Sequence, residues 1–356
     1  TPLRNHSETK MAVKVVDLFC GAGGLTHGLH LAGLDVVAGI DLEGECRVAY
    51  ESNNDALFIE KDISLVTKDE IENLFEGASV KVLAGCAPCQ PFSKYTQGKD
   101  KKNDKKWPLL YEFERLIKDT KPEIVTMENV PDVTKHSVYD DFYNTLIALG
   151  YYVWANKIEC VDFEVPQNRV RHVLLASKFA PISLMKPQTS VKLTVRDCIG
   201  NLPSIEAGQA DPKDPLHKAS RLSEINLKRI LHSKPGGTWR DWPAELIASC
   251  HAKKSGQGYA SVYGRMSWDK PSPTITTLCY GFGNGRFGHP EQHRAISLRE
   301  AALLQTFPVT YSFTQPGEPI KMKNVGRMIG NAVPVNLGKA IGLSIVHHLK
   351  EFHPAA

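Results

Sequence analysis

The sequence predicts an α/β protein with a doubly wound, mostly parallel sheet and a second, smaller, loop-rich domain. Short apolar, β-branched runs alternate with helix-period stretches through the first half of the chain. A glycine-rich turn at 20–24 (CGAGG) follows the first run, as in folds that hold a nucleotide at a helix N-terminus. From residue 179 the alternation stops, and Pro, Gly, Ser and Lys become frequent. We therefore expect a first domain at 11–178, a second at 179–294, and a return to the first domain at 295–356.

The expected elements follow one another in regular order. Strands are expected at 14–19, 35–40, 57–60, 82–85 and 122–127, and helices at 25–34, 43–52, 68–75 and 108–118. The runs 151–163 and 170–177 have no helix between them, so they should pair as a hairpin, with an antiparallel final strand at the edge of the sheet. Helical periodicity returns at 297–305 and 337–352, and the last of these is apolar on one face, so it should pack back on the first domain.

Composition excludes several classes of protein. The 356 residues are 42% hydrophobic and 23% charged, which is ordinary for a water-soluble chain with a large core. No apolar run approaches the ~18 residues of a membrane span, so we expect none. The eight cysteines are scattered, which favours a reducing cytoplasm over disulfides. Only one CxxC occurs and it has no second pair, so we expect no bound metal.

Basic charge is concentrated in two segments. Residues 93–107 carry six lysines against two aspartates, and residues 178–294 carry 17 Lys and Arg against 9 Asp and Glu. Two positive surfaces that face one cleft would suit a polyanion, although lysine runs are also common on ordinary solvated faces.

Residues that can do chemistry come directly after two consecutive strands. Cys89, between Pro88 and Pro91, follows the strand at 82–85, at the sheet edge where α/β proteins bind ligands. It is a candidate nucleophile; a buried structural thiol, or a redox or half-zinc pair with Cys86, are the alternatives. Glu128 follows the next strand, so a thiol and a carboxylate should face one pocket.

Two further features point to the same edge of the sheet. Asp41 lies about 20 residues beyond the glycine turn, the spacing at which a carboxylate meets ribose hydroxyls, although the turn could also be purely structural. Arg169 and Arg171 stand at i and i+2, which places both guanidinium groups on one face of a strand.

These residues belong to segments that closely resemble the cytosine-carbon-5 DNA methyltransferases, a family that uses S-adenosylmethionine. The resembling segments, in the order of the family, are DLFCGAGG at 17–24, PCQPFS at 88–93, ENV at 128–130, QNRVR at 167–171, SLREAALLQTFP at 297–308 and GNAVP at 330–334. The resemblance covers about 14–178 and 294–350. The segment between corresponds to the region with which the family recognises its target sequence.

The resemblance implies a mechanism. Cys89 would attack carbon 6 of a cytosine flipped out of a specific duplex DNA sequence, and Glu128 would contact ring nitrogen 3. Arg171 would contact the base oxygen, and Arg169 or Arg171 would lower the thiol pKa. The catalytic set is therefore Cys89, Glu128, Arg169 and Arg171.

The resemblance also implies a cofactor site and DNA contacts. The expected contacts to S-adenosylmethionine are Phe19, Gly21, Gly23, Leu25, Asp41, Leu42, Asp62, Ile63, Pro88 and Asn331. The expected DNA contacts are Gln90, Ser93, Lys94, Lys101, Lys102, Arg240, Arg265, Thr276 and Arg286. Leu42 stands where many members have an aromatic residue that stacks on adenine. We expect a monomeric bacterial enzyme of the restriction-modification type, cytoplasmic and associated with the nucleoid when it binds double-stranded DNA.

Three other functions remain open at this point. A tRNA-directed member of the same family would keep the same catalytic residues. A non-catalytic DNA-binding protein on this scaffold would not need Cys89, Glu128 and Arg171. A dinucleotide oxidoreductase would explain the glycine turn and Asp41, but not the segments around Cys89 and Glu128.

Overall fold

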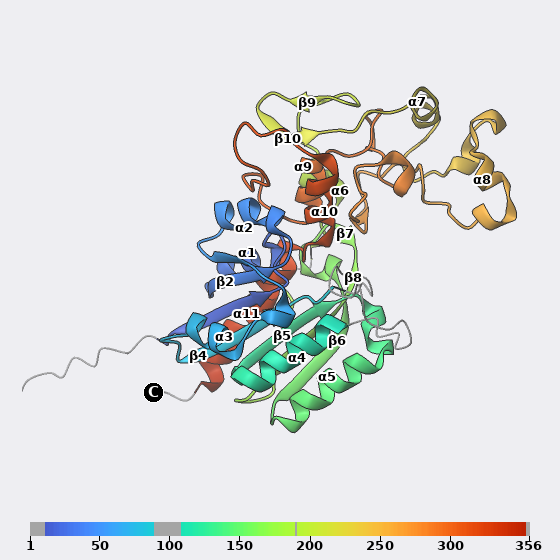
Figure 1. Ribbon diagram of the computed structural model, residues 1–356. Coiled ribbons are helices and arrows are strands. Elements are labelled where there is room, and N and C mark those ends of the chain that lie inside the picture. The colour runs from blue at the N-terminus through green and yellow to red at the C-terminus, as the bar shows by residue number, and fades with distance from the viewer. Residues whose placement is uncertain (1–10, 89–107, 189–190, 354–356) are drawn as a thin grey trace, which may run out of the picture.

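A mixed seven-stranded sheet forms the centre of the computed structural model, which describes residues 11–88, 108–188 and 191–353. The strand order is β3-β2-β1-β4-β5-β8-β6 (Figure 1). The strands are β1 (Val13–Leu18), β2 (Asp35–Asp41), β3 (Leu57–Glu60), β4 (Val80–Gly85), β5 (Ile124–Asn129), β6 (Tyr152–Glu159) and β8 (Val170–Ser177). All neighbours in the sheet pair in parallel except the two pairs that involve β8. The predicted doubly wound, mostly parallel sheet is confirmed.

The predicted hairpin is confirmed, but its place in the sheet is not. β6 and β8 pair antiparallel, yet β8 lies between β5 and β6, so the antiparallel strand is interior and β6 forms the edge. The burial of the two strands explains this order. β8 is buried from His172 to Ser177, whereas every residue of β6 is partly or fully exposed. The more apolar strand therefore takes the position that is covered on both sides.

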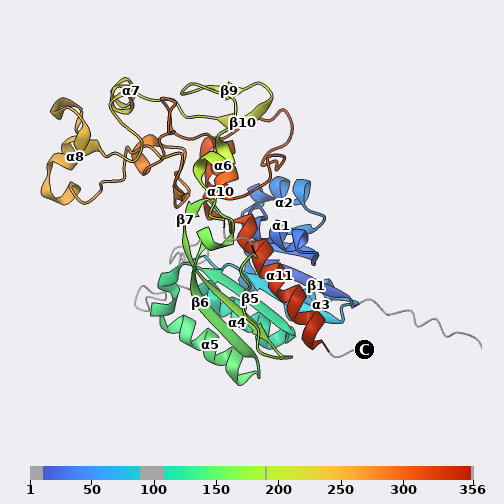
Figure 2. The ribbon, with the colours of Figure 1, turned by 180° about the vertical axis from the view of Figure 1, so that it is seen from behind.

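Helices cover both faces of the sheet. α3 (Lys68–Leu74), α4 (Pro108–Thr120) and α5 (Ser137–Ala148) cover one face, and α1 (Gly24–Leu31) and α11 (Val335–Phe352) cover the other (Figures 1 and 2). Successive residues of β1 serve the two faces in turn, since Val16 packs with the first group and Val15 with the second. α11 packs along α1, as its apolar face predicts.

Most expected helices agree with the structure, with small shifts at their ends. The helix expected at 43–52 is a short 3-10 turn, Gly44–Cys46, followed by α2 (Arg47–Asn53). Outside the expected second domain, two described helices, α5 and α10 (Met322–Asn331), have no counterpart among the expected elements. In α5 the signal was present, because Val138, Phe142 and Leu146 recur at four-residue spacing and are buried.

The second region stands at one end of the sheet, in the upper part of Figure 1. Its elements are β7 (Gln167–Asn168), α6 (Val195–Ile199), β9 (Ala210–Asp211), β10 (Asp214–Lys218), α7 (Glu224–Leu231), α8 (Ser249–Ala252), β11 (Ser272–Pro273) and α9 (Leu298–Leu304). One buried apolar cluster joins Val195 of α6 and Leu298 of α9 to Cys20 and Tyr50 of the first domain. This core contains residues from all three predicted segments, 11–178, 179–294 and 295–356. The predicted domain boundaries stay predictions.

The segment Met322–Phe352 is long and apolar enough, by length and composition alone, to cross a membrane. In the structure 67% of its most apolar window is buried, and the chain leaves the helical conformation at Ala332, between α10 and α11. Both features are those of a core segment that packs against the sheet.

Candidate active site

The glycine turn leaves one side of its backbone open. Phe19 (φ 58°) and Gly21 (φ 52°) both adopt the left-handed conformation directly after β1. The Gly21 N–H donates to Asp41 Oδ2 at 2.8 Å, so the turn is tied to the end of β2. A side chain built on Gly21 would meet nothing within 4 Å. The turn therefore has room for a ligand to approach its backbone, as a nucleotide cradle requires.

The other glycines of the turn are needed for packing. A Cβ on Gly23 would lie 2.8 Å from the Tyr311 hydroxyl, and one on Gly24 would lie 2.3 Å from the carbonyl oxygen of Val333. The first contact joins the turn to a loop near the end of the chain, and the second joins it to the segment between α10 and α11. The cradle is thus built from both ends of the sequence.

Asp17 is a residue of this site that the sequence reasoning missed. It is buried in β1, where its Oδ2 accepts a hydrogen bond from Thr26 Oγ1 at 2.7 Å and its Oδ1 has no partner. Burial raises the pKa of Asp17 to about 7; the Thr26 hydrogen bond opposes this rise, and the charge of Asp41 adds to it. A buried carboxyl beneath the turn, with one unsatisfied oxygen, favours a cationic ligand nearby.

The other predicted cofactor residues differ in exposure. Asp41 also accepts a hydrogen bond from the Glu43 N–H, and burial raises its pKa. Leu25 and Ile63 are core side chains, 4% and 3% exposed, so a ligand would reach them mainly through their backbone. The predicted cofactor residues that reach the surface at least in part are Phe19, Gly21, Asp41, Leu42, Asp62, Pro88 and Asn331.

Glu128 lies in a polar corner at the carboxyl ends of β4, β5 and the start of β8. The residue is only 3% exposed. Its Oε2 accepts a hydrogen bond from Cys86 Sγ at 3.0 Å, and its Oε1 forms an ion pair with Arg171 Nε at 3.1 Å. The Arg171 guanidinium lies close to Oε1 but does not form a hydrogen bond with it. Oε1 is therefore a buried carboxylate oxygen that accepts no hydrogen bond.

Sheet register explains this convergence. β4 and β5 pair in parallel with Gly85 opposite Met127, so the next residues, Cys86 and Glu128, lie side by side. Glu128 pairs with Val173 of β8, and Arg171 is two residues from Val173 on the same face of that strand. The structure therefore brings Glu128 and Arg171 together, while the predicted meeting of Glu128 with Cys89 stays a prediction.

The chain that leads to Cys89 is fixed to the same corner. Asn129 Nδ2 donates to the Ala87 carbonyl oxygen at 3.0 Å, two residues before Cys89. Cys89 itself lies outside the described residues, and its predicted role stays a prediction. The same holds for the expected DNA contacts Gln90, Ser93, Lys94, Lys101 and Lys102.

Arg169 contacts the protein rather than the open corner. Its guanidinium is 4% exposed and donates to the carbonyl oxygens of Ile275 (2.9 Å), Gly330 (3.3 Å) and Ala332 (3.4 Å). Burial, together with the charge of Arg171, lowers its pKa to about 10. These contacts hold the end of α10 against the chain before Thr276, and the predicted catalytic role of Arg169 stays a prediction.

One predicted DNA contact is wrong. Arg265 is 3% exposed, and all five of its N–H groups are used: four carbonyl oxygens and a ring nitrogen accept them. Its guanidinium cannot reach a guanine without breaking this network, so Arg265 is a structural residue. Arg240 and Thr276 are exposed and Arg286 partly so, and these three stay predicted contacts.

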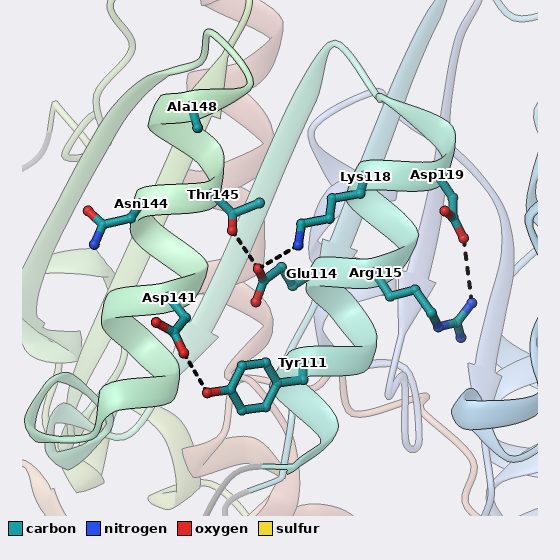
Figure 3. A pocket seen from close by; sticks show the side chains of 9 residues that line it. All are labelled: Tyr111, Glu114, Arg115, Lys118, Asp119, Asp141, Asn144, Thr145 and Ala148. Atoms are coloured by element: carbon teal, nitrogen blue, oxygen red, sulfur yellow. Dashed lines mark hydrogen bonds and ion pairs between the residues drawn. The ribbon is translucent and has the colours of Figure 1, made fainter.

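A surface pocket among the described residues lies away from this site. It has a volume of about 550 Å³ and lies between α4 and α5 (Figure 3). Polar and charged side chains in it pair with one another: the Tyr111 hydroxyl donates to Asp141, and both Thr145 and Lys118 donate to Glu114. It includes none of the predicted site residues. Across residues 11–88, 108–188 and 191–353 we also find no cluster of His, Cys, Asp and Glu able to hold a metal.

A doubly wound sheet with a glycine turn and polar side chains at the carboxyl ends of adjacent strands is typical of enzymes that bind a nucleotide-like ligand at that edge. Residues 13–347 match the family model for C-5 cytosine-specific DNA methylases. This match covers most of the chain, which therefore belongs to that family and is a DNA (cytosine-5-)-methyltransferase; the family reaction requires a methyl donor.

Curated relatives agree with this assignment. The chain is 53% identical over 348 residues to the Type II methylase M.HgiDII of Herpetosiphon aurantiacus, with 96% of this chain and 98% of the relative covered. It is 32% identical to the Type II methyltransferase M.Eco47II of Escherichia coli, with 97% and 82% covered.

Solved structures show the same fold at low identity. A prophage-encoded E. coli protein described as a DNA modification methyltransferase superposes with a TM-score of 0.73 at 21% identity, covering 95% of this chain and all of that one. The S. pombe Dnmt2 methyltransferase gives a TM-score of 0.59 at 18% identity, with 95% and 98% covered.

Proposed function

We propose that the enzyme transfers a methyl group from S-adenosylmethionine to carbon 5 of a cytosine flipped out of a specific duplex DNA sequence, through a covalent adduct with Cys89. The observation that carries this proposal is the corner around Glu128. A buried carboxylate with one unsatisfied oxygen, beside Arg171 and directly before Asn129 in the chain, suits a polar heterocycle. Such a base can enter only after it has left the duplex stack.

The steps assign one task to each residue. The Cys89 thiolate forms a bond to carbon 6, and Glu128 gives a proton to ring nitrogen 3, so that carbon 5 becomes an enamine carbon able to accept the methyl group. A base such as water then takes the carbon 5 proton, the nitrogen 3 proton returns to Glu128, and the Cys89 thiolate leaves carbon 6, which restores the aromatic ring. Arg171, already beside Glu128, donates to the base oxygen.

The residues of the glycine cradle fit the proposed cofactor. When bound, S-adenosylmethionine supplies a methyl group on a sulfonium. Gly21 leaves space beside its backbone, Asp41 ends the neighbouring strand, and the unsatisfied oxygen of Asp17 lies in a region that favours positive charge. The remaining predicted cofactor contacts are Phe19, Gly23, Leu25, Leu42, Asp62, Ile63, Pro88 and Asn331.

The proposed partner is double-stranded DNA, bound by a monomer in the bacterial cytoplasm. Relatives named Type II methylase and methyltransferase support a role of the restriction-modification type. Lysines and arginines on phosphates would make DNA affinity strongly dependent on salt.

Two variants test the assignment. Cys89→Ser should abolish methyl transfer while it leaves DNA affinity within about tenfold, or ~1.4 kcal/mol. Glu128→Gln should lower turnover by about 100-fold or more, because the amide cannot supply the proton. Loss of DNA binding in parallel with activity in the first variant, or wild-type turnover in the second, contradicts the roles.

Methylation mapping on a plasmid that carries the gene gives the base, the carbon and the sequence context together. A parallel assay on tRNA transcripts separates the DNA reading from the tRNA alternative, because methyl incorporation into tRNA alone would overturn the proposal.

A further inference from the structure

Cys86 occupies a place that the proposed mechanism does not use. It is the first residue after β4 and is partly buried. Its sulfur lies 3.0 Å from Glu128 Oε2, the oxygen opposite the one that Arg171 faces. Each oxygen of the carboxylate therefore has a different neighbour, the thiol on one side and the guanidinium on the other.

The thiol in this place is a hydrogen-bond donor. Burial first, and then the charge of Glu128, raise the pKa of the Cys86 thiol, so the sulfur keeps its proton. An S–H beside a carboxyl group can donate to one of its oxygens, and that oxygen accepts whether or not the other oxygen carries a proton for the base. The other charged or titratable groups that act on this pair are Asp17 from β1, Cys160 from the turn after β6, and Arg169 and Arg171 from the start of β8.

This bond fixes which oxygen is available. Since Oε2 is held by the thiol, the unsatisfied Oε1 is the oxygen left for a ligand. A carboxylate free to rotate about its last bond would present either oxygen, and a reaction that needs one proton at one ring nitrogen would lose that alignment.

We propose that Cys86 is a positioning residue for the methyl-transfer reaction: its S–H group orients the Glu128 carboxylate so that Oε1 faces the target base. This inference rests on the proposed function, because it assigns a helper to the proposed proton donor. It makes Cys86 a second thiol of the site, with a role different from that of Cys89.

Two substitutions distinguish loss of the Cys86 hydrogen-bond donor from a change in side-chain volume. Cys86→Ser keeps a donor, whereas Cys86→Val fills similar space without one. We expect Cys86→Val to lower the single-turnover rate of methyl transfer to duplex DNA about tenfold, equal to ~1.4 kcal/mol in the barrier, with KM for DNA within about twofold. Cys86→Ser should remain within about threefold of the wild type. Cys198→Ala, which removes a partly buried thiol on α6, is the matched control and should leave the rate unchanged.

Each outcome has one meaning. A wild-type rate in Cys86→Val, or an equal loss in the Ser and Val variants, overturns the positioning role. Absence of cytosine methylation by the wild-type enzyme overturns the proposed function instead, before any variant is compared. Melting temperatures are measured for every variant, and Cys86→Ala replaces Cys86→Val in the comparison if the valine variant does not fold.

Discussion

Replacement of Arg265 by methionine tests whether this arginine stabilises the fold or contacts DNA. The five N–H groups donate to the carbonyl oxygens of Ile230, Ser233, His289 and Gln292 and to His293 Nδ1, at distances from 2.7 to 3.0 Å. Hydrogen bonds from a charged donor contribute about 1.5–3 kcal/mol each. The buried cation offsets part of this, because burial lowers the pKa of Arg265 from 12.5 to about 10, which is ~3 kcal/mol of desolvation.

These contributions are not additive within one network, so we take the expected loss from deletions of one partner of a buried polar network, which cost about 3–5 kcal/mol. For a chain of this size that corresponds to a melting temperature lower by about 5 °C or more. Arg240→Met is the control: the side chain is exposed, so its melting temperature should stay within about 1 °C while DNA affinity weakens and becomes less sensitive to salt.

Thermal unfolding and DNA affinity are measured on both variants. If Arg265→Met melts like the wild type and loses sequence-specific affinity, the residue contacts DNA directly and the structural assignment fails.

Three further outcomes are expected. Gly24→Ala should lower the affinity for S-adenosylmethionine, measured by calorimetry, about tenfold or more, because the new Cβ would lie 2.3 Å from the Val333 carbonyl oxygen. Gly258→Ala is the control, since its Cβ would meet nothing within 4 Å, and its affinity should not change. Equal affinities in the two variants would mean that the turn adapts to the added Cβ. The pKa of Asp17 is raised from 3.8 to about 7, so its protonated form stabilises the fold fully below about pH 4 and that contribution is lost as pH rises through 7. The free energy of unfolding of the wild type, relative to Asp17→Asn, should thus fall between those pH values, and a flat difference would refute the buried proton. Arg169→Met should reduce the free energy of unfolding by about 2–4 kcal/mol in urea titrations, and full stability with lost turnover would restore its catalytic assignment.

The sequence alone predicted the features that depend on local residue pattern or on which strands follow one another. Short β-branched runs located all seven strands of the main sheet to within a few residues, although the edge position of the antiparallel strand was wrong. The place of Glu128 at the end of β5 followed from the strand pattern, whereas its contact with Arg171 was not among the predictions. The same register argument would have placed Cys86 beside Glu128, since each is the residue next to a paired position.

The sequence was insufficient where burial depends on distant loops. Arg240 and Arg265 both stand among aromatic residues in the same basic segment, and no local pattern distinguishes them. Arg265 is buried because carbonyl groups from residues 230–233 and 289–292 converge on it, which is a property of tertiary structure. Asp17 was missed for a similar reason, because its environment is completed by Thr26 and by the neighbouring strand end.

The contact between the first glycine turn and the segment around Val333 has a consequence for synthesis of the enzyme. A ribosome releases residues 20–24 more than three hundred positions before the chain that packs on them. Until that late segment emerges, the turn lacks its supporting wall and should hold the methyl donor poorly. A chain that is stalled or cut before this segment should therefore not methylate DNA, and activity should appear only after α10 and α11 have been synthesised.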